Sequence, residues 1–384
     1  MSVLKSRPVL RWLVPVTAVA TVIGGGAALG TFAAQAEPSL PPRTAAQLLV
    51  DLQTSRLEGL SGTVVQRADL GLPPLAGLVA GDGLTGLLTG THTLRVWHSG
   101  PDRQRVALMD TRGQSDIIRN GRDVWVWNSR GNTATHRTLP EHAATQRAAE
   151  LPATPGEAAD RALAAIDPST EVSVGRSATV AGRDAYELVL APRDAASLVH
   201  QVRIAIDARE HVPLRFEVFA EGSDKPAFEL AFTQVSYARP DADQFSFNPP
   251  PGVRVTEETA GKHSTAAPGE RPAKGRQHAD GKRPGDGERP DVRTVGESWA
   301  TVVVARIDGA GAPERAAKEA TGDRAAKGAT GDPAALLGAL PAVSGDWGSG
   351  RLLTGKLFSA LLTDDGRLIV GAVTPERLYE VARG

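Results

Sequence analysis

Four segments near the middle of the chain alternate between bulky apolar residues and polar or small ones. Side chains alternate between the two faces of a β-strand, so this pattern predicts four strands with one shared apolar face. The residues are Tyr186, Leu188 and Leu190; Val202, Ile204 and Ile206; Leu214, Phe216 and Val218; and Phe228, Leu230 and Phe232. Something must cover the continuous apolar face of such a sheet. The proline-rich segment Phe245–Gly252 is predicted to end the sheet.

A second group of short strands is predicted upstream of these four. The apolar spacing of Ala45–Leu57 predicts a helix that Thr44 can cap, and Gly59–Gly62 breaks it. Glycine-containing turns then separate most of the following strands, as is typical of an antiparallel meander. The predicted strands are Thr63–Gln66, Leu94–His98, Gln104–Met109, Ser115–Arg119, Asp123–Asn128 and Thr133–Leu139.

Helical patterns return between the two groups of strands, at Glu141–Glu150 and Glu157–Ile166. Glu171–Val174 then leads into the four alternating strands. A helix, a meander, two helices and a second meander predict an α+β fold. In this fold the helices cover one face of a single large antiparallel sheet.

Two later stretches lack the apolar residues that a core requires. Glu257–Thr294 is rich in proline, glycine and mixed charge. Asp308–Pro333 contains a tandem repeat, in which RAAKEATGD at Arg315–Asp323 is followed by RAAKGATGD at Arg324–Asp332. Such segments cannot bury enough surface to offset the entropy of ordering them, so both are predicted to be solvated spacers.

Structure is predicted to resume around these spacers. Trp299–Ile307 and Leu352–Leu362 have strand-like patterns, Asp365-Gly366 is typical of a hairpin turn, and Pro375–Ala382 is predicted to be a terminal helix. The predicted organisation is an N-terminal segment 1–36, a main domain 37–256, a linker 257–295, and a small C-terminal α+β region 296–384 with the insert 308–333.

The N-terminal segment is typical of an export signal. Basic residues precede the apolar stretch Trp12–Ala34, and Ala34-Gln35-Ala36 fits a small-residue cleavage site. The stretch is long for a signal peptide, so an uncleaved membrane anchor is the alternative. Both interpretations place the body of the protein outside the cytoplasmic membrane, either in the cell envelope or secreted.

Composition narrows the class of protein further. The chain has no cysteine, which excludes disulfides, a cysteine nucleophile, thiolate metal sites and a lipid-modified cysteine. The formal net charge is −1 and no long run carries one sign of charge, so nucleic acid is not an expected partner.

No catalytic motif is recognisable. The eight histidines are scattered and none forms a His-x-x-x-His pair, and there is no Gly-x-Ser-x-Gly elbow, phosphate loop or dinucleotide fingerprint. The sequence therefore predicts a protein that is not an enzyme and that uses no cofactor or metal.

Two other apolar features need an explanation. The segment Val124-Trp125-Val126-Trp127 is apolar on both faces of a predicted strand, so it needs cover on both sides. Its tryptophans are either ordinary core residues, or Trp97 and one of Trp125 and Trp127 line a ligand cavity.

The second feature is the loop Asp69–Gly90, which reads DLGLPPLAGLVAGDGLTGLLTG. Burying each leucine is worth about 1.5–3 kcal/mol relative to exposure, so a fully exposed loop of this kind is costly. The loop is either a plug under the sheet or a lid or membrane-contacting flap. The leucines assigned to the lid are Leu72, Leu75, Leu78, Leu84 and Leu87.

In the order and spacing of several short stretches, the chain resembles the LolA-type lipoprotein-carrier family and its relatives, the MucB/RseB N-terminal domain and the YdcC-like sporulation proteins. The resemblance covers about residues 40–255. It rests on Gly59–Thr63, Leu94–Trp97, Asn120–Trp127, Val180–Leu190, Val212–Arg215 and Phe245–Gly252. The region from Gly296 onward is more weakly similar to the second domain of RseB-type proteins.

The resemblance implies a half-open antiparallel β-barrel with helices covering its concave apolar face. It also implies that acyl chains or another lipid moiety lie between the sheet and the helices. An apolar concavity with a movable cover can shield a lipid from water. The residues expected to line the cavity are Trp97, Trp125, Tyr186, Leu188, Leu190, Ile204, Phe216, Phe228, Leu230 and Phe232.

Three functions are compatible with this picture. The leading hypothesis is an exported, non-catalytic carrier that binds lipid or lipoprotein acyl chains. The alternative is an RseB-like envelope-stress regulator that binds an anti-sigma factor or another membrane sensor. A third is a structural envelope protein whose concavity is filled by its own side chains.

Overall fold

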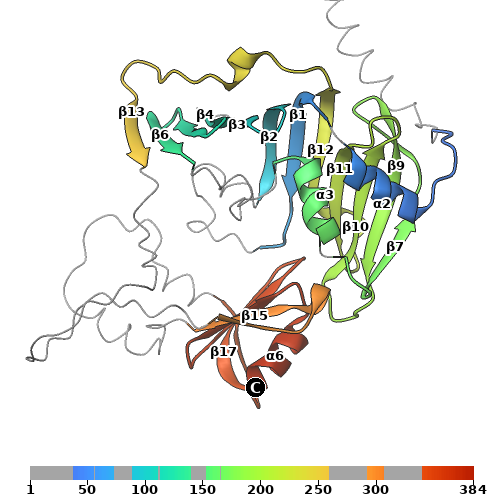
Figure 1. The fold of residues 1–384 in the computed structure, drawn as a ribbon. Helices are drawn as coiled ribbons and strands as arrows, with labels where there is room; N and C mark the ends of the chain where they lie inside the picture. The colour runs from blue at the N-terminus through green and yellow to red at the C-terminus, as the bar shows by residue number, and fades with distance from the viewer. Residues whose placement is uncertain are drawn as a thin grey trace, which may run out of the picture.

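The computed structural model describes residues 38–55, 57–72, 89–110, 113–139, 153–164, 166–258, 292–306 and 340–384. The predicted export signal, the predicted helix Glu141–Glu150 and the insert 308–333 lie outside these residues. The described residues form two sheets and three α-helices (Figure 1). They are mostly β-sheet with few helices, and they confirm a large, mostly antiparallel sheet that does not close on itself. The predicted domain boundaries stay predictions.

The large sheet has thirteen strands. Its order is β13-β6-β5-β4-β3-β2-β1-β12-β11-β10-β9-β7, and β8 pairs with β9 outside this path. β1 joins the two meanders, because it pairs with β2 on one side and with β12 on the other. The strands are β1 Gly59–Ala68, β2 Gly90–Ser99, β3 Arg103–Asp110, β4 Gly113–Asn120, β5 Asp123–Asn128, β6 Thr133–Thr138, β7 Thr170–Val174, β8 Ala178–Val180, β9 Arg183–Pro192, β10 Val199–Asp207, β11 Pro213–Ala220, β12 Pro226–Ser236 and β13 Arg254–Glu258.

The strand register confirms that the four alternating segments share one face. Leu188 lies opposite Ile204, Ile204 opposite Phe216, and Phe216 opposite Leu230. Directly opposed residues point to the same side of a sheet. We call this side the apolar face and the opposite side the outer face.

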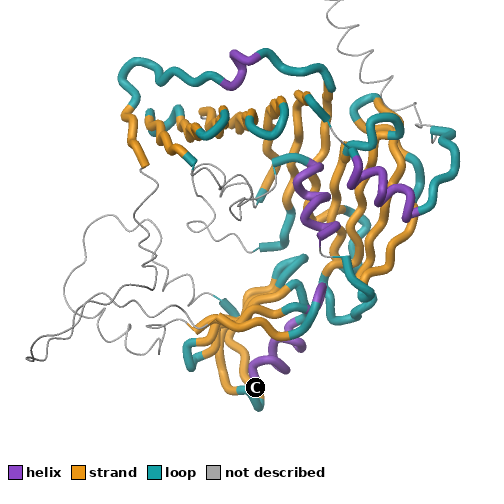
Figure 2. The backbone as a smooth tube through the Cα atoms, viewed as in Figure 1, coloured by secondary structure: helices purple, strands orange, loops and turns teal. Residues whose placement is uncertain are grey.

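Helices α2 (Ala45–Thr54) and α3 (Pro155–Ala164) pack on the apolar face. Figures 1 and 2 show both helices in front of the β9–β12 half of the sheet. α2 contacts β7 and β9, and α3 contacts β10, β11 and β12. Leu48 of α2 and Ala158 and Ala159 of α3 belong to the same buried core as the strand residues. The small alanine side chains let α3 approach the sheet closely.

The prediction that Phe245–Gly252 ends the large sheet is wrong. The chain forms the 3-10 helix η4 (Ala242–Phe245) and then adds β13 parallel to β6 (Figure 1). Glu257 and Glu258 are therefore strand rather than linker. An edge strand needs only backbone pairing on one side, so the polar composition of this segment did not reveal it.

The second sheet lies near the C-terminus, with strand order β14-β15-β19-β18-β17-β16. Its strands are β14 Val292–Val295, β15 Val302–Arg306, β16 Ala342–Gly345, β17 Gly348–Thr354, β18 Ser359–Thr363 and β19 Arg367–Gly371. Helix α6 (Pro375–Arg383) packs on one face and buries Leu378 and Val381.

The C-terminal predictions are confirmed in part. The terminal helix and the Asp365-Gly366 turn are present. The predicted strand Leu352–Leu362 is instead two strands, β17 and β18, which pair with each other. The short 3-10 helix η5 (Ser298–Ala300) takes the start of the predicted strand Trp299–Ile307, and β14 takes the end of the predicted linker.

Backbone hydrogen bonds join the two sheets. The Leu198 N–H donates to Ala372 O and the Thr374 N–H to Ala196 O, each at 2.9 Å. The indole Nε1 of Trp299 donates to Thr170 Oγ1 at 2.8 Å. The C-terminal sheet is therefore fixed to the β7, β9 and β10 end of the large sheet.

Candidate ligand-binding face

Most of the predicted cavity residues lie on the apolar face beneath α2 and α3. Leu188, Leu190, Ile204 and Leu230 are fully buried at 0% exposure. The other members of this group are Tyr186, Phe216 and Phe232, which are buried, and Phe228, which is half-buried. Side chains of the chain itself therefore cover the sheet at β9–β12.

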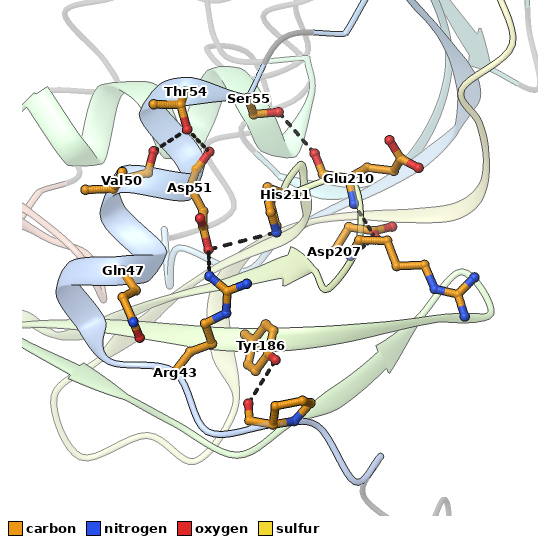
Figure 3. Close-up of polar contacts among 12 residues, drawn as sticks. Arg43, Gln47, Val50, Asp51, Thr54, Ser55, Tyr186, Asp207, Glu210 and His211 are labelled. Carbon is orange, nitrogen blue, oxygen red and sulfur yellow. Dashed lines mark hydrogen bonds and ion pairs between the residues drawn. The ribbon is translucent and has the colours of Figure 1, made fainter.

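Contacts at both ends fasten α2 over the sheet (Figure 3). At its N-terminus Thr44 and Gln47 form a capping box, which satisfies backbone N–H groups that the helix leaves unpaired. Just before the helix, Pro41 O accepts a hydrogen bond from the Tyr186 hydroxyl at 2.9 Å. At the other end Ser55 Oγ donates to Glu210 O at 3.2 Å. The cover over β9 is thus held by polar bonds as well as by apolar packing.

An ion-pair chain adds to this attachment. Arg43 Nη1 lies 2.9 Å from Asp51 Oδ2, and His211 Nε2 lies 3.9 Å from the same oxygen (Figure 3). His211 belongs to the β10–β11 turn, where its φ of 58° is in the left-handed region. The turn places its imidazole against α2.

β10 ends, just before this turn, at a buried carboxylate, Asp207, which is 1% exposed. It accepts hydrogen bonds from Arg183, from the Tyr237 hydroxyl at 2.8 Å, and from the backbone N–H groups of residues 209 and 210. Burial acts to raise the pKa of Asp207, but these bonds outweigh it and hold the pKa below its ordinary value. Burial and the neighbouring carboxylate both raise the pKa of Tyr237. These groups brace the turn rather than form a reactive site.

The expectation that Trp97 and Trp125 line the cavity is wrong, and the alternative that they are ordinary packing residues holds. Trp97 lies opposite Arg105, Arg105 opposite Ile118, and Ile118 opposite Trp125. On β2 it is Leu94 and Val96, the alternate residues, that belong to the core beneath the helices. Trp97 and Trp125 therefore point to the outer face and do not share a cavity with Leu188. The Val-Trp-Val-Trp pattern is apolar on both sides, so it could not show which side faces the helices.

On the outer face these tryptophans contact the segment that follows β12. The Phe247 ring centroid lies 5.2 Å from that of Trp125 and 6.0 Å from that of Trp127. Arg105 lies over the Trp97 ring and donates from Nη1 to Gln244 O at 3.2 Å. Its Nε also bonds the buried Asp116 carboxylate at 3.0 Å. These contacts explain the tryptophans as packing partners of the chain between η4 and β13.

The apolar face continues beyond the helices, which the sequence interpretation missed. Val96, Val106, Ile117 and Val126 form one row of opposed residues across β2 to β5. Exposure rises along this row from 3% at Val96, through the half-buried Val106 and Ile117, to 46% at Val126. Within the described residues, α2 and α3 lie over the other half of the sheet (Figure 1). We call Val106, Ile117 and Val126 the open apolar stripe.

The predicted lid can be located only at its start. Leu72 is half-buried, whereas Leu75, Leu78, Leu84 and Leu87 lie outside the described residues. At the start of the loop the Lys356 N–H donates to Leu70 O at 2.7 Å, and Lys356 Nζ pairs with Asp69 Oδ2 at 2.5 Å. The C-terminal sheet therefore holds the point where this loop leaves β1.

The described part of the chain contains no group of three or more histidine, aspartate or glutamate residues placed to hold a metal ion. In the same part of the chain, no helix has the length and apolar character of a membrane span. Within the described residues, the apolar face is covered over one half and partly open over the other.

Comparisons with known proteins identify the family that the chain resembles. Residues 88–250 match the model of the MucB/RseB N-terminal domain, which confirms the predicted resemblance to the LolA-type and MucB/RseB group. This match spans β2 to η4 and includes the open apolar stripe. No curated protein matches the chain.

A search of solved structures finds similar chains at low identity. A chain of the Pseudomonas aeruginosa MucA/MucB complex has 16% identity and a TM-score of 0.45, with 88% of this chain and 96% of that chain covered. An uncharacterised conserved protein from Thermus thermophilus has 13% identity and a TM-score of 0.32, with 56% and 99% covered. A LolA-superfamily protein from Nitrosomonas europaea has 14% identity and a TM-score of 0.22, with 54% and 99% covered.

Proposed function

We propose that this protein is an exported, non-catalytic protein of the cell envelope that holds acyl chains of a lipid or lipoprotein. The observation that supports this most directly is the open apolar stripe, where the apolar face continues past the helices that cover the rest of it. The sheet then acts as a half-open barrel whose concave wall is shared by the protein core and the ligand.

The energetics favour an acyl chain as the ligand. Each methylene group that leaves water gains about 0.8 kcal/mol, so even a few methylenes bound along the stripe supply useful affinity. The stripe contains valine and isoleucine only, so its side chains can bind a ligand by apolar contact but not by hydrogen bonds. This composition favours a flexible hydrocarbon over a polar small molecule.

The test is a charge placed on the stripe. We expect Val126→Glu to leave the fold intact, because the side chain is 46% exposed, and to weaken acyl-chain binding at least tenfold, about 1.4 kcal/mol. Met109→Glu is the matched control, because Met109 is 44% exposed and lies on the outer face, in register with Thr93. Displacement of a fluorescent fatty acid measures both variants.

Native mass spectrometry of the gently purified wild-type protein provides a second readout. A bound lipid is expected, and it should be depleted in the Val126→Glu variant. Equal lipid retention by Val126→Glu and Met109→Glu would show that the stripe is not the binding surface.

A regulator of envelope stress is the second candidate. The match to the MucB/RseB N-terminal domain favours it, together with a C-terminal sheet that is hydrogen-bonded to the large sheet. On this alternative the protein binds an anti-sigma factor or membrane sensor, and lipid acts as the signal. Capture of a single-pass membrane protein, released by added lipid, would favour the regulator. Lipid transfer to an acceptor without such a partner would favour the carrier.

A further inference from the structure

Strand β13 occupies the edge of the large sheet without joining its core. It pairs with β6 in parallel, from Arg254 opposite Thr133 to Glu258 opposite Arg137 (Figure 1). All five of its residues are exposed, including Val255 at 45%. Backbone pairing, rather than burial of side chains, therefore holds β13 in place.

One side chain of β13 makes a specific polar contact with β6. Glu257 Oε2 lies 2.8 Å from His136 Nδ1, and Asp123 Oδ1 lies 3.2 Å from His136 Nε2. Trp125 stacks on the imidazole with a centroid distance of 4.3 Å. Each ring nitrogen faces a carboxylate oxygen, so only the doubly protonated ring can donate to both.

The charges around His136 come from three strands. Asp123 lies on β5 and Glu257 on β13, and both carry negative charge toward the ring. On β6 itself the next residue is Arg137, which is exposed. Partial burial acts to lower the pKa of His136, but the two carboxylates outweigh it and the pKa is raised. His136 is therefore the point at which β6 holds a carboxylate of the strand beside it.

We propose that the β6 edge is a binding site for an extended acidic peptide of a partner protein, and that β13 fills it as an internal stand-in. An edge strand pairs with any extended backbone, and the side chains alternating along it give specificity. Here the specificity element is a carboxylate opposite His136. The incoming segment runs parallel to β6, as β13 does. This site is separate from the open apolar stripe and does not depend on lipid binding.

Displacement of β13 tests the proposal on the full-length protein. Glu257→Lys places a cation beside His136 and should loosen β13. A fluorescent peptide with the sequence of residues 253–260, VRVTEETA, should then bind the Glu257→Lys protein at least tenfold more tightly than it binds wild type. Fluorescence anisotropy measures the affinity. Thr256→Lys is the matched control and should behave like wild type, because residue 256 is exposed and lies opposite the uncharged Thr135 and not His136.

Two further measurements separate the proposal from simple unfolding. The Arg254 N–H donates to Asn132 O, so alternate residues of β13 donate to β6 and Thr256 is the next donor. Thr256→Pro therefore loosens β13 by removing a backbone donor and should also increase peptide binding, without altering the charge at His136. In the Glu257→Lys background, peptide binding should weaken as the pH rises above the pKa of His136, and His136→Gln should abolish this dependence. Failure of both Glu257→Lys and Thr256→Pro to bind the peptide, while hydrogen exchange shows β13 released, would overturn the proposal. Equally tight binding of a peptide with lysine at the position of Glu257 would overturn the requirement for a carboxylate.

Discussion

At the scale of single residues, the decisive information is which face of the sheet each side chain occupies. In the four alternating segments the sequence indicates which face is apolar, because polar or small residues occupy the other positions. Leu188 and Leu230 are buried on that face, as the pattern predicts. Val124–Trp127 gives no such signal, since all four residues are apolar. The pairing of β5 with β4 shows which side chains lie on which face. Val126 lies opposite Ile117 on the apolar face, and Trp125 lies on the outer face. Sequence alternation alone could not supply that information.

The most sensitive polar residue is expected to be Asp207. Removing one partner of a buried ion pair costs about 3–5 kcal/mol, and the partial exposure of Arg183 places this pair near the lower end. We therefore expect Asp207→Asn to lower the free energy of unfolding by about 3 kcal/mol, measured by urea denaturation at neutral pH. Asp184→Asn, at an exposed site near the start of β9, should have no measurable effect.

The pH dependence of this effect has a definite sign. The folded-state pKa of Asp207 is depressed below its ordinary value of 3.8, so its contribution is fully present above that value. The contribution is lost as the pH falls through the folded-state pKa. The gap in stability between wild type and Asp207→Asn should therefore narrow in strong acid. A gap that widens on acidification would contradict this assignment.

At the scale of elements, local patterns predict strands and helices well where they are periodic and poorly where they are not. α2, α3 and α6 were recognisable from helical spacing and capping residues, and most strands from alternation and glycine turns. β13 was not, because an exposed edge strand has no apolar period. Its position beside β6 follows from backbone pairing between segments far apart in the sequence, which composition does not record.

The two halves of the apolar face should respond differently to an inserted charge. Leu230 of β12 is fully buried in the core shared with α3, so Leu230→Arg forces a cation into that core and should unfold the protein. Thr233→Arg, at an exposed site on the same strand, should leave the circular dichroism spectrum and melting temperature unchanged. A folded Leu230→Arg protein would show that the helices leave room at β12, and the ligand site would then extend beneath them.

At the scale of the whole molecule, the C-terminal sheet is attached to the large sheet and also to the start of the Asp69–Gly90 loop. A change in the position of one sheet must therefore affect the segment leading into that loop. The sequence predicted a separate C-terminal region, but it contained no sign of the backbone bonds at Ala196 and Leu198 that join the two.

Because the C-terminal sheet is bonded to the large sheet, we expect the two sheets to unfold together. Calorimetry of the wild-type protein should give one transition, because Trp299 packs against the main core and also bonds Thr170. Trp299→Ala removes apolar contacts worth about 1.5–3 kcal/mol and should split the profile into two transitions. Trp347 lies in the turn between β16 and β17 and stacks on Tyr379 of α6, so Trp347→Ala should lower the stability of the C-terminal sheet without affecting its attachment. Two transitions in wild type would show that the sheets are independent.

The central claim is that an acyl chain lies against β3, β4 and β5. Photolabelling with a diazirine fatty acid, followed by peptide mapping, measures this directly. The account predicts that the label falls on the strands that carry Val106, Ile117 and Val126, and that Val126→Glu abolishes it there. Labelling confined to the outer face or to the C-terminal sheet, or labelling that Val126→Glu leaves unchanged, would contradict the account.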